Sequence, residues 1–373
     1  MSEPMKVNML ATARNVQWSA NTFLGFGSVK LVAPAKVNLF LGVGARREDG
    51  YHDVVNVMHA LALHDTLYMN CLPAERASSA GVLAGLGEAV GALAKGSLAE
   101  ADLPDYVAAG GPEDNLLVCI DCADKVADDA APGMAALDVP ARSNIVFKAI
   151  DALARELGRT ARECVVVRLE KSIPHEGGLG GGSSDAAAAL LGAARFWGVA
   201  SDDPAVEKVA RALGADVAFF LKGGCARFVG AGEIADGSLA PMKNPVVLVK
   251  PNAGVSTPEA YRTFDEAPVP IPSEHRAKVG EAASAQDVPL FNNLEAAAHE
   301  VLPELEDVRA WLVAQEGVAS SENVRLCGSG STTFAIADSF AAACSIAAAA
   351  QSRGWWARAT TLSALRAVEL PQR

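Results

Sequence analysis

The chain has 373 residues, half of them hydrophobic, which is enough for two domains with a large core. Its formal net charge of −12 argues against nucleic acid or an anionic membrane as a partner, because both bind basic surfaces. No apolar run approaches the roughly 20 residues of a membrane helix, and residues 1–20 have no apolar signal-peptide core, so we expect a soluble, cytoplasmic protein.

The first part of the chain has the pattern of β-strands, after an N-terminal extension over residues 1–27 to which we assign no function. A turn is expected over 50–53, where Gly, Tyr, His and Asp follow one another. The expected strands cover 28–43, which is broken at Pro34, then 54–63 and 65–70.

The segment 71–142 differs from its surroundings, because it is rich in Ala, Gly, Asp and Pro and poor in large apolar residues. It contains 12 Asp and Glu against 4 Lys and Arg, a net charge of −8. We therefore interpret it as an acidic insertion that is peripheral to the core. Within it, residues 114–118 resemble 143–147, and each opens an apolar, helix-like stretch, but two short matches do not establish a duplication.

Helices and strands alternate in the rest of the chain. The expected helices cover 144–157, 185–197, 204–213 and 340–353, and the expected strands cover 163–170, 248–250 and 355–361, with a strand–turn–strand unit over 324–337. A strand-rich first half followed by mixed helices and strands fits two α+β domains. We place these domains at 28–240 and 241–373.

A glycine-rich segment over residues 174–184 lies between an expected strand and an expected helix. Glycines let the backbone come close to a ligand, and a helix N-terminus directs unpaired N–H groups and the positive end of its dipole toward that ligand. The segment matches neither the Walker A loop nor the G-x-G-x-x-G motif. It predicts another kind of phosphate-binding loop, with a triphosphate as its natural ligand, rather than a flexible linker.

Two further segments accompany this loop in an order that resembles the three motifs of the GHMP kinase superfamily. Residues 33–39 (APAKVNL) resemble the first motif, 174–184 the second and 326–331 (LCGSGS) the third. The resemblance covers nearly the whole chain except the extension and the acidic insertion. It implies a two-domain kinase that binds ATP and its substrate in the cleft between an N-terminal, nucleotide-binding domain and a C-terminal domain.

Three shorter matches narrow the resemblance to one family. Residues 35–41 (AKVNLFL), 47–52 (Arg-x-x-Gly-Tyr-His) and 213–220 (LGADVAFF) resemble the 4-diphosphocytidyl-2-C-methyl-D-erythritol kinases, although Ala218 stands where proline is usual. The resemblance implies phosphorylation of the substrate's 2-hydroxyl in the non-mevalonate route to isoprenoids, with ATP and Mg²⁺. The alternatives are another GHMP kinase, of the homoserine or mevalonate type, and an inactive homologue that binds nucleotide.

The resemblance also assigns the catalytic residues. In phosphoryl transfer the attacking hydroxyl must lose a proton, and the developing charge must be stabilised. The family match places Asp216 beside the hydroxyl, so we expect it to be the general base. Lys36 is its expected partner, which would hold Asp216 ionised and orient it or the hydroxyl. A salt bridge that only joins the domains is the alternative interpretation.

The binding residues are assigned in the same way. ATP is expected at Pro174, His175, Glu176, Gly177, Gly178, Leu179, Gly180, Gly181, Gly182, Ser183, Ser184 and Asn144. Asn115 is a second candidate for the adenine contact, but the spacing of Asn144 from the loop better suits one intervening helix and strand. Ser183 and Ser184 could cap the helix or contact phosphate or Mg²⁺. The substrate is expected at Asn38, Tyr51, His52, Thr257, Gly328, Ser329 and Gly330, with Tyr51 and His52 at its cytidine end.

The cysteines and histidines show no metal or disulfide pattern. Seven cysteines, an odd number, do not suggest a disulfide framework, and Cys119 and Cys122 are interpreted as reduced thiols on a helical segment. Six histidines form no ligand motif. We therefore expect no protein-held metal site, with Mg²⁺ bound mainly by the triphosphate, and the sequence leaves monomer and homodimer open.

Overall fold

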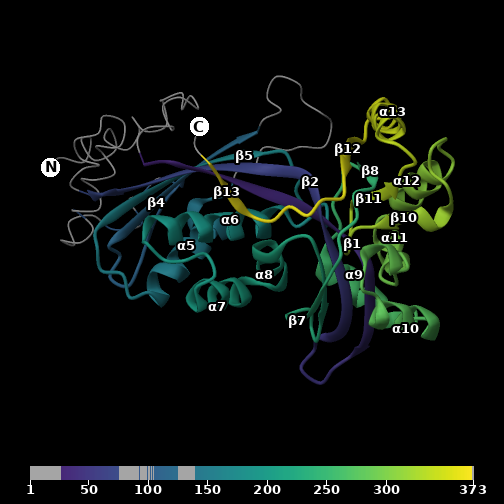
Figure 1. Cartoon of the computed structure of the whole chain (residues 1–373), viewed down its shortest axis with the longest axis horizontal. Helices are drawn as coiled ribbons and strands as arrows, with labels where there is room; N and C mark the ends of the chain where they lie inside the picture. The colour runs from purple at the N-terminus through teal and green to yellow at the C-terminus, as the bar shows by residue number, and fades with distance from the viewer. Residues whose placement is uncertain are drawn as a thin grey trace.

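The computed structural model describes residues 27–74, 105–124 and 139–371, together with the single residues 92, 99, 101 and 103. The N-terminal extension up to residue 26 and much of the acidic segment lie outside these described residues. The described residues form two β-sheets, one of 9 strands and one of 4 strands (Figure 1). This mixture of sheets with helices confirms the α+β class.

The large sheet begins with one long hairpin of β1 (Val29–Arg46) and β2 (His52–Pro73), which pair in antiparallel fashion. Their register shifts between Pro34 and Lys36, because proline has no N–H to donate. The break predicted at Pro34 is therefore an irregularity within one strand, and the strands predicted over 54–63 and 65–70 are one continuous strand.

The remaining strands of the large sheet are β3 (Val107–Gly110), β4 (Leu116–Asp124), β5 (Glu163–Lys171), β6 (Cys225–Val229), β7 (Ile234–Leu239), β9 (Phe291–Asn292) and β13 (Val368–Leu370). The strand order is β13-β1-β2-β5-β4-β3, with β6 on β2, β7 on β6 and β9 on β1. Both β9 and β13 belong to the C-terminal part of the chain and pair with β1. The two parts of the chain are thus joined by strand pairing.

Part of the acidic segment belongs to the core, which corrects the interpretation of 71–142 as a peripheral insertion. Strand β4 pairs in parallel with β5, and Leu117, Val118 and Cys119 on it are at most 2% exposed. An aliphatic run without a polar face suits a strand that is buried on both sides. The expectation of a helix after Asn115 is therefore wrong, and Cys119 lies on a strand instead. Because a strand follows Asn115 and a helix follows Asn144, the two segments are not a duplicated unit.

Helices α5 (Ile145–Glu156) and α6 (Gly181–Phe196) lie against one face of the large sheet, and α7 (Pro204–Leu213) and α8 (Ala215–Lys222) pack on these two helices (Figure 1). The alanines of α6 are almost completely buried. Gly192 allows α6 to pack closely on the sheet, because a Cβ at this position would lie 2.6 Å from the Sδ of Met69. This packing fixes the helix whose N-terminus meets the glycine-rich loop.

The small sheet has the order β10-β11-β8-β12. Its strands are β8 (Pro245–Lys250), β10 (Val324–Leu326), β11 (Thr333–Ile336) and β12 (Trp356–Thr361), and the helices of this part are α9 (Thr257–Glu266), α10 (Ser273–Glu281), α11 (Glu295–Val301), α12 (Glu304–Val313) and α13 (Phe340–Gln351). Trp356 is completely buried, in a hydrophobic cluster to which both sheets contribute. Within the described part of the chain, every helix is too short or too polar to cross a membrane.

Candidate active site

The glycine-rich loop connects β5 to α6 and is held from both sides by backbone hydrogen bonds. The amide of Lys36 donates to the carbonyl of Leu179 at 2.9 Å, and the amide of Ser331 donates to the carbonyl of Glu176 at 3.0 Å. Lys36 belongs to the first sequence motif and Ser331 to the third. The three motifs, although far apart in the chain, therefore meet around this loop.

Helix α6 starts inside the loop. Its first residue is Gly181, its N-cap is Gly180 with φ of +72°, and no side chain caps it, which corrects the interpretation of Ser183 or Ser184 as the cap. Ser183 lines a cavity of about 280 Å³ within the loop, whereas Ser184 is fully buried. Since backbone amides at a helix N-terminus favour anions, the cavity suits a phosphate group.

Two glycines bring the second and third motifs into contact. Gly178 has φ of +71°, and a Cβ there would lie 2.0 Å from the carbonyl oxygen of Cys327, so no other residue fits without displacing the backbone. A Cβ on Gly328 would lie 3.8 Å from the Nζ of Lys36. The third motif therefore faces the predicted catalytic lysine.

The structure brings Lys36 and Asp216 together. The Nζ of Lys36, a residue that is only 4% exposed, lies 3.8 Å from the Oδ2 of Asp216 and donates to the Oδ1 of Asn38 at 2.9 Å. Asn38 in turn donates to the Oδ1 of Asn56 at 2.8 Å. Asp216 lies in the first turn of α8, where a carboxylate is favoured by the helix dipole, and about a third of its side chain is exposed. A bound hydroxyl can therefore reach this carboxylate.

A second cavity, of about 520 Å³, is lined by the β1–β2 hairpin and α9. Tyr51 is exposed at its edge, and the ring of His52 is buried with its centroid 5.2 Å from that of Tyr261. Burial and the negative charge of Asp216 raise the pKa of the Tyr261 hydroxyl. This cavity also adjoins the lysine–aspartate pair, because the third motif, which faces Lys36, reaches it as well.

Residues of the third motif reach the same cavity. The hydroxyl of Thr257, which lines it, lies 2.7 Å from the hydroxyl of Ser329. Gly330 follows with φ of +96°. Asn292 was not predicted, yet its side-chain amide donates to the carbonyl of Gly328 at 2.8 Å and fixes the turn. No motif marks Asn292, so its role follows only from the fold.

The two asparagines considered for the adenine contact differ in their surroundings. Asn115 donates to the carbonyls of Arg159 and Ala161 and ties the start of β4 to the loop before β5. Asn144 is the N-cap of α5 and accepts from the amide of Val146, and its neighbour Ile145 lines the cavity of the glycine-rich loop. Asn144 therefore lies nearer the loop cavity than Asn115, and its contact with adenine stays a prediction.

An ionic cluster that the sequence analysis missed lies under the loop. The Nζ of Lys171 donates to Asp65 at 2.5 Å and to Asp185 at 2.7 Å, and all three side chains are almost fully buried. Burial alone would lower the pKa of Lys171, but the two carboxylates more than offset it, so this pKa is raised. Burial and the neighbouring Asp65 raise the pKa of Asp185 to about 8, despite Lys171. Asp65 also accepts from the amide of Ile173 at 2.9 Å, which anchors the entry to the loop.

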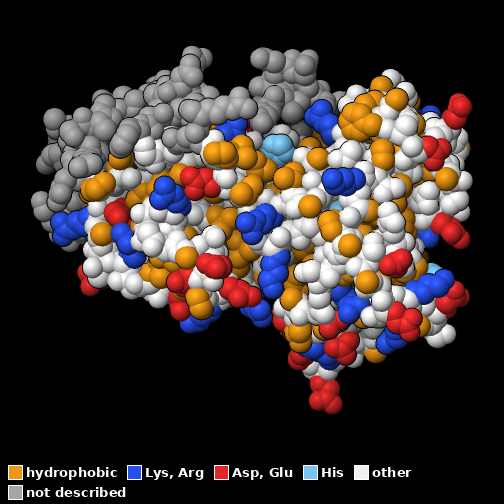
Figure 2. Space-filling model, viewed as in Figure 1, with side chains coloured by type: hydrophobic (Ala, Val, Ile, Leu, Met, Phe, Trp, Pro, Cys, Tyr) orange, Lys and Arg blue, Asp and Glu red, His pale blue; other side chains and the backbone are white. Residues whose placement is uncertain are grey.

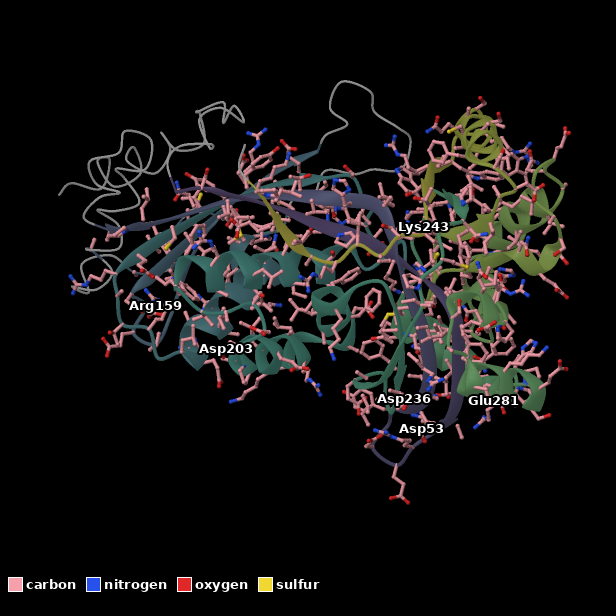
Figure 3. The ribbon with its side chains drawn as sticks, viewed as in Figure 1. Asp53, Arg159, Asp203, Asp236, Lys243 and Glu281 are labelled. Atoms are coloured by element: carbon pink, nitrogen blue, oxygen red, sulfur yellow. The ribbon has the colours of Figure 1, made fainter. Side chains whose placement is uncertain are left out.

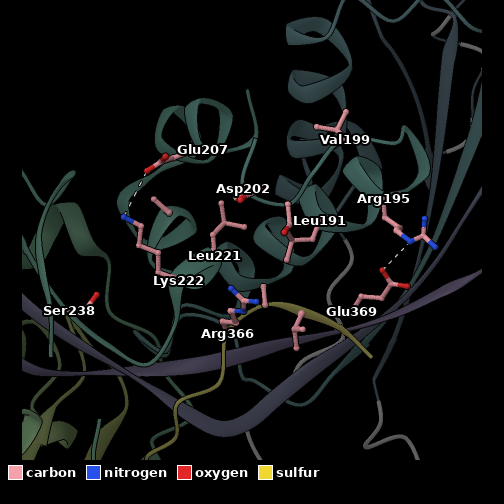
Figure 4. A pocket seen from close by; sticks show the side chains of 14 residues that line it. Leu191, Arg195, Val199, Asp202, Glu207, Leu221, Lys222, Ser238, Arg366 and Glu369 are labelled. Atoms are coloured by element: carbon pink, nitrogen blue, oxygen red, sulfur yellow. Dashed lines mark ion pairs between the residues drawn. The ribbon is translucent and has the colours of Figure 1, made fainter. Parts of the chain in front are cut away.

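A larger cavity, of about 650 Å³, lies between α6, α7, α8 and β13 (Figure 4). Its charges are balanced: Arg195 lies 3.6 Å from Glu369 and Lys222 lies 3.9 Å from Glu207. Acidic and basic side chains are similarly interspersed over the face shown in Figure 2. Lys222 is the last residue of α8, whereas Asp216 is in its first turn, so this cavity is separate from the site of the lysine–aspartate pair.

The fold and the glycine-rich loop place this chain among the GHMP kinases. The sequence profile of the GHMP kinases N terminal domain matches residues 144–224. A crystal structure of a homoserine kinase from Cytophaga hutchinsonii superposes with a TM-score of 0.57, covering 95% of this chain and 100% of that one. At 16% sequence identity, this similarity establishes the shared two-domain fold alone.

Sequence similarity identifies one family within the GHMP kinases. A protein of Nocardioides sp. named 4-diphosphocytidyl-2-C-methyl-D-erythritol kinase is 36% identical over 73% of this chain and 77% of its own length. A protein of the same name from Desulfitobacterium hafniense is 30% identical over 88% and 93%. A crystal structure of 4-(cytidine 5'-diphospho)-2C-methyl-D-erythritol kinase has a TM-score of 0.59 at 29% identity, over 90% of this chain and 99% of that one. The chain belongs to the 4-diphosphocytidyl-2-C-methyl-D-erythritol kinase family.

Proposed function

We propose that this chain transfers the γ-phosphoryl group of ATP to the 2-hydroxyl of 4-diphosphocytidyl-2-C-methyl-D-erythritol, a step of the non-mevalonate route to isoprenoids, in the cytoplasm. The observation that carries the proposal is the position of the Lys36–Asp216 pair. It adjoins the phosphate-binding loop through Lys36, and it adjoins the cavity of Tyr51 and His52 through the third motif, where Ser329 contacts the cavity-lining Thr257. A hydroxyl and a phosphoryl donor bound in the two cavities would meet at this pair.

Asp216 acts as the general base in this proposal. Its Oδ2 accepts the proton of the 2-hydroxyl, the hydroxyl oxygen forms a bond to the γ-phosphorus, and the bond to the β-phosphate oxygen breaks to release ADP. The ammonium of Lys36, 3.8 Å away, holds the carboxylate in position toward the hydroxyl. Asn38 and Asn56 hold Lys36 in place, so the pair is oriented before substrate binds.

The loop residues bind the triphosphate in this proposal. The amides at the start of α6 would contact the phosphate oxygens, and the hydroxyl of Ser183 and the carboxyl group of Glu176, which both line the loop cavity, could contact a phosphate-bound cation. Mg²⁺ typically keeps few protein ligands and binds substrate phosphates directly, and among the described residues no cluster of three His, Cys, Asp or Glu could hold it. Bound in this way, Mg²⁺ would neutralise phosphate charge. Excess EDTA should then abolish turnover, and full activity in EDTA would contradict this part.

A coupled assay of ADP formation tests the proposed function. The full chain is incubated with ATP, Mg²⁺ and one acceptor at a time: 4-diphosphocytidyl-2-C-methyl-D-erythritol, homoserine or mevalonate. We expect turnover with the cytidine compound alone. Preference for either of the others would place the chain in another branch of the fold, and ATP binding without turnover of any acceptor would indicate an inactive homologue.

A further inference from the structure

The imidazole of His52 is held by a residue from the other part of the chain. His52 begins β2, and its Nε2 lies 2.7 Å from the Oδ1 of Asp265 on α9. The other oxygen of Asp265 lies 3.6 Å from an Nη of Arg46. The rings of Tyr261 and Phe264, also on α9, pack around the imidazole at centroid distances of 5.2 and 6.2 Å. His52 therefore has a fixed ring orientation inside the cavity.

This contact determines which nitrogen of His52 carries the proton. An ionised carboxylate only accepts hydrogen bonds, and the second oxygen of Asp265 already faces the guanidinium of Arg46. The Nε2 of His52 must therefore donate to Asp265. In a neutral imidazole one nitrogen donates and the other accepts, so Nδ1 is left as an acceptor. Within the described part of the chain, no group hydrogen-bonds to Nδ1.

An acceptor at this position distinguishes two pyrimidines. Cytosine presents an amino group at C4, which donates a hydrogen bond, whereas a uracil-type base presents a carbonyl oxygen at C4, which only accepts. Resting on the proposed function, we infer that Asp265 is a positioning residue for substrate specificity. By fixing the tautomer of His52, it directs Nδ1 to accept a hydrogen bond from the 4-amino group of the substrate's cytosine and to reject uracil.

Burial of His52 makes it costly to place the Nδ1 acceptor against the C4 carbonyl of uracil, which is also an acceptor. His52 is only 7% exposed, so water has little access to a mismatched pair, and a buried polar group without a partner is costly. One neutral hydrogen bond corresponds to about tenfold in affinity. Discrimination by Nδ1 should therefore be at least about tenfold, and it should depend on Asp265, which does not itself touch the base.

The test compares kcat and KM for the cytidine substrate and for its uridine analogue in three proteins: the wild type, Asp265→Asn and the control Asp53→Asn. The amide that Asp265→Asn introduces can donate as well as accept, so the tautomer of His52 is no longer fixed. Asp53 neighbours His52 in the chain but is largely exposed near the end of the β1–β2 hairpin, where it pairs with Arg47 (Figure 3).

We expect Asp265→Asn to raise KM for the cytidine substrate about tenfold with kcat nearly unchanged, and to reduce the cytidine-to-uridine ratio of kcat/KM about tenfold or more. The control should behave as the wild type. An unchanged ratio in Asp265→Asn overturns the inference, as does an equal loss for both substrates. A wild type without activity on the cytidine substrate would instead contradict the proposed function, so the two failures are distinguishable.

A second measurement reports the tautomer in the wild-type chain itself, without any change at Asp265. ¹H–¹⁵N NMR of the imidazole nitrogens in the wild-type chain, with His52→Gln used to assign the signals among the six histidines, reports the tautomer directly. We expect His52 to carry its proton on Nε2 with an unprotonated Nδ1. A proton on Nδ1 in the neutral ring would overturn the inference.

Discussion

Removing the ammonium of Lys171 should test whether the buried ionic cluster supports the phosphate-binding loop. Lys171→Met keeps the length of the side chain but leaves Asp65 and Asp185, both almost fully buried, without their cation. Breaking a buried ion pair by removing one partner costs about 3–5 kcal/mol. Unfolding entropy of about 2.1 cal/mol/K per residue amounts to roughly 0.8 kcal/mol/K for the whole chain, so Tm should fall by about 4–6 °C.

The control is Lys208→Met, which makes the same chemical change at the surface. Lys208 is mostly exposed and pairs with Glu156 at 2.8 Å, and such pairs contribute about 0–1 kcal/mol. Asp65 also holds the entry to the loop, so ATP should bind more weakly to Lys171→Met. A Tm loss no greater than that of the control, measured by calorimetry, would refute this account.

Three further predictions concern the loop, the buried acid and the acidic segment. Gly178→Ala should abolish ATP binding, measured by calorimetric titration, whereas Gly198→Ala, also at positive φ but with open space at its Cβ, should lose only about 1 kcal/mol of stability. The pKa of Asp185 is raised in the folded state, to about 8, so its favourable contribution is complete at acid pH and is lost as the pH rises toward 8. The free energy of unfolding of the wild type, relative to Asp185→Asn, should therefore fall between about pH 4 and 8, and a rise would contradict the assignment. Replacing residues 75–104 by a short Gly/Ser linker should leave a folded, ATP-binding protein. Extending the deletion through β3 should destabilise the protein, because that strand is buried. Insolubility of the shorter deletion would show that residues 75–104 are part of the core.

Local patterns in the sequence identify the parts of the site that are close together along the chain. The strand before the glycine-rich loop lies where the sequence predicts it, and the helix after it begins at Gly181, four residues earlier than predicted; β-branched residues, glycines and alanines specify these elements locally. Lys36 and Asp216 are also brought together. Their pairing comes from the family resemblance, since no local pattern relates residues on two distant elements.

The features that the sequence analysis missed depend on tertiary structure. Strand β4 was expected to be a helix because a short apolar run fits either element until its neighbours are known. Lys171 is joined to Asp65, which is more than a hundred positions away, and His52 to Asp265 across an even longer separation. Such contacts between distant charged groups leave no periodic signal, and only the packed structure shows them.

The assignment of Asp216 as the general base is the central claim, and kcat of Asp216→Asn tests it most directly. Asparagine keeps the shape of the side chain but not its basicity, and a positioned general base contributes about 10²- to 10⁴-fold. We expect kcat to fall by that amount while the dissociation constants of ATP and substrate and the Tm change little. Lys36→Met should also lower kcat, and the double variant should lose less than the product of the two single losses. A salt bridge that only joined the two parts of the chain would lower Tm and weaken both ligands. A nearly normal kcat in Asp216→Asn would contradict the assignment.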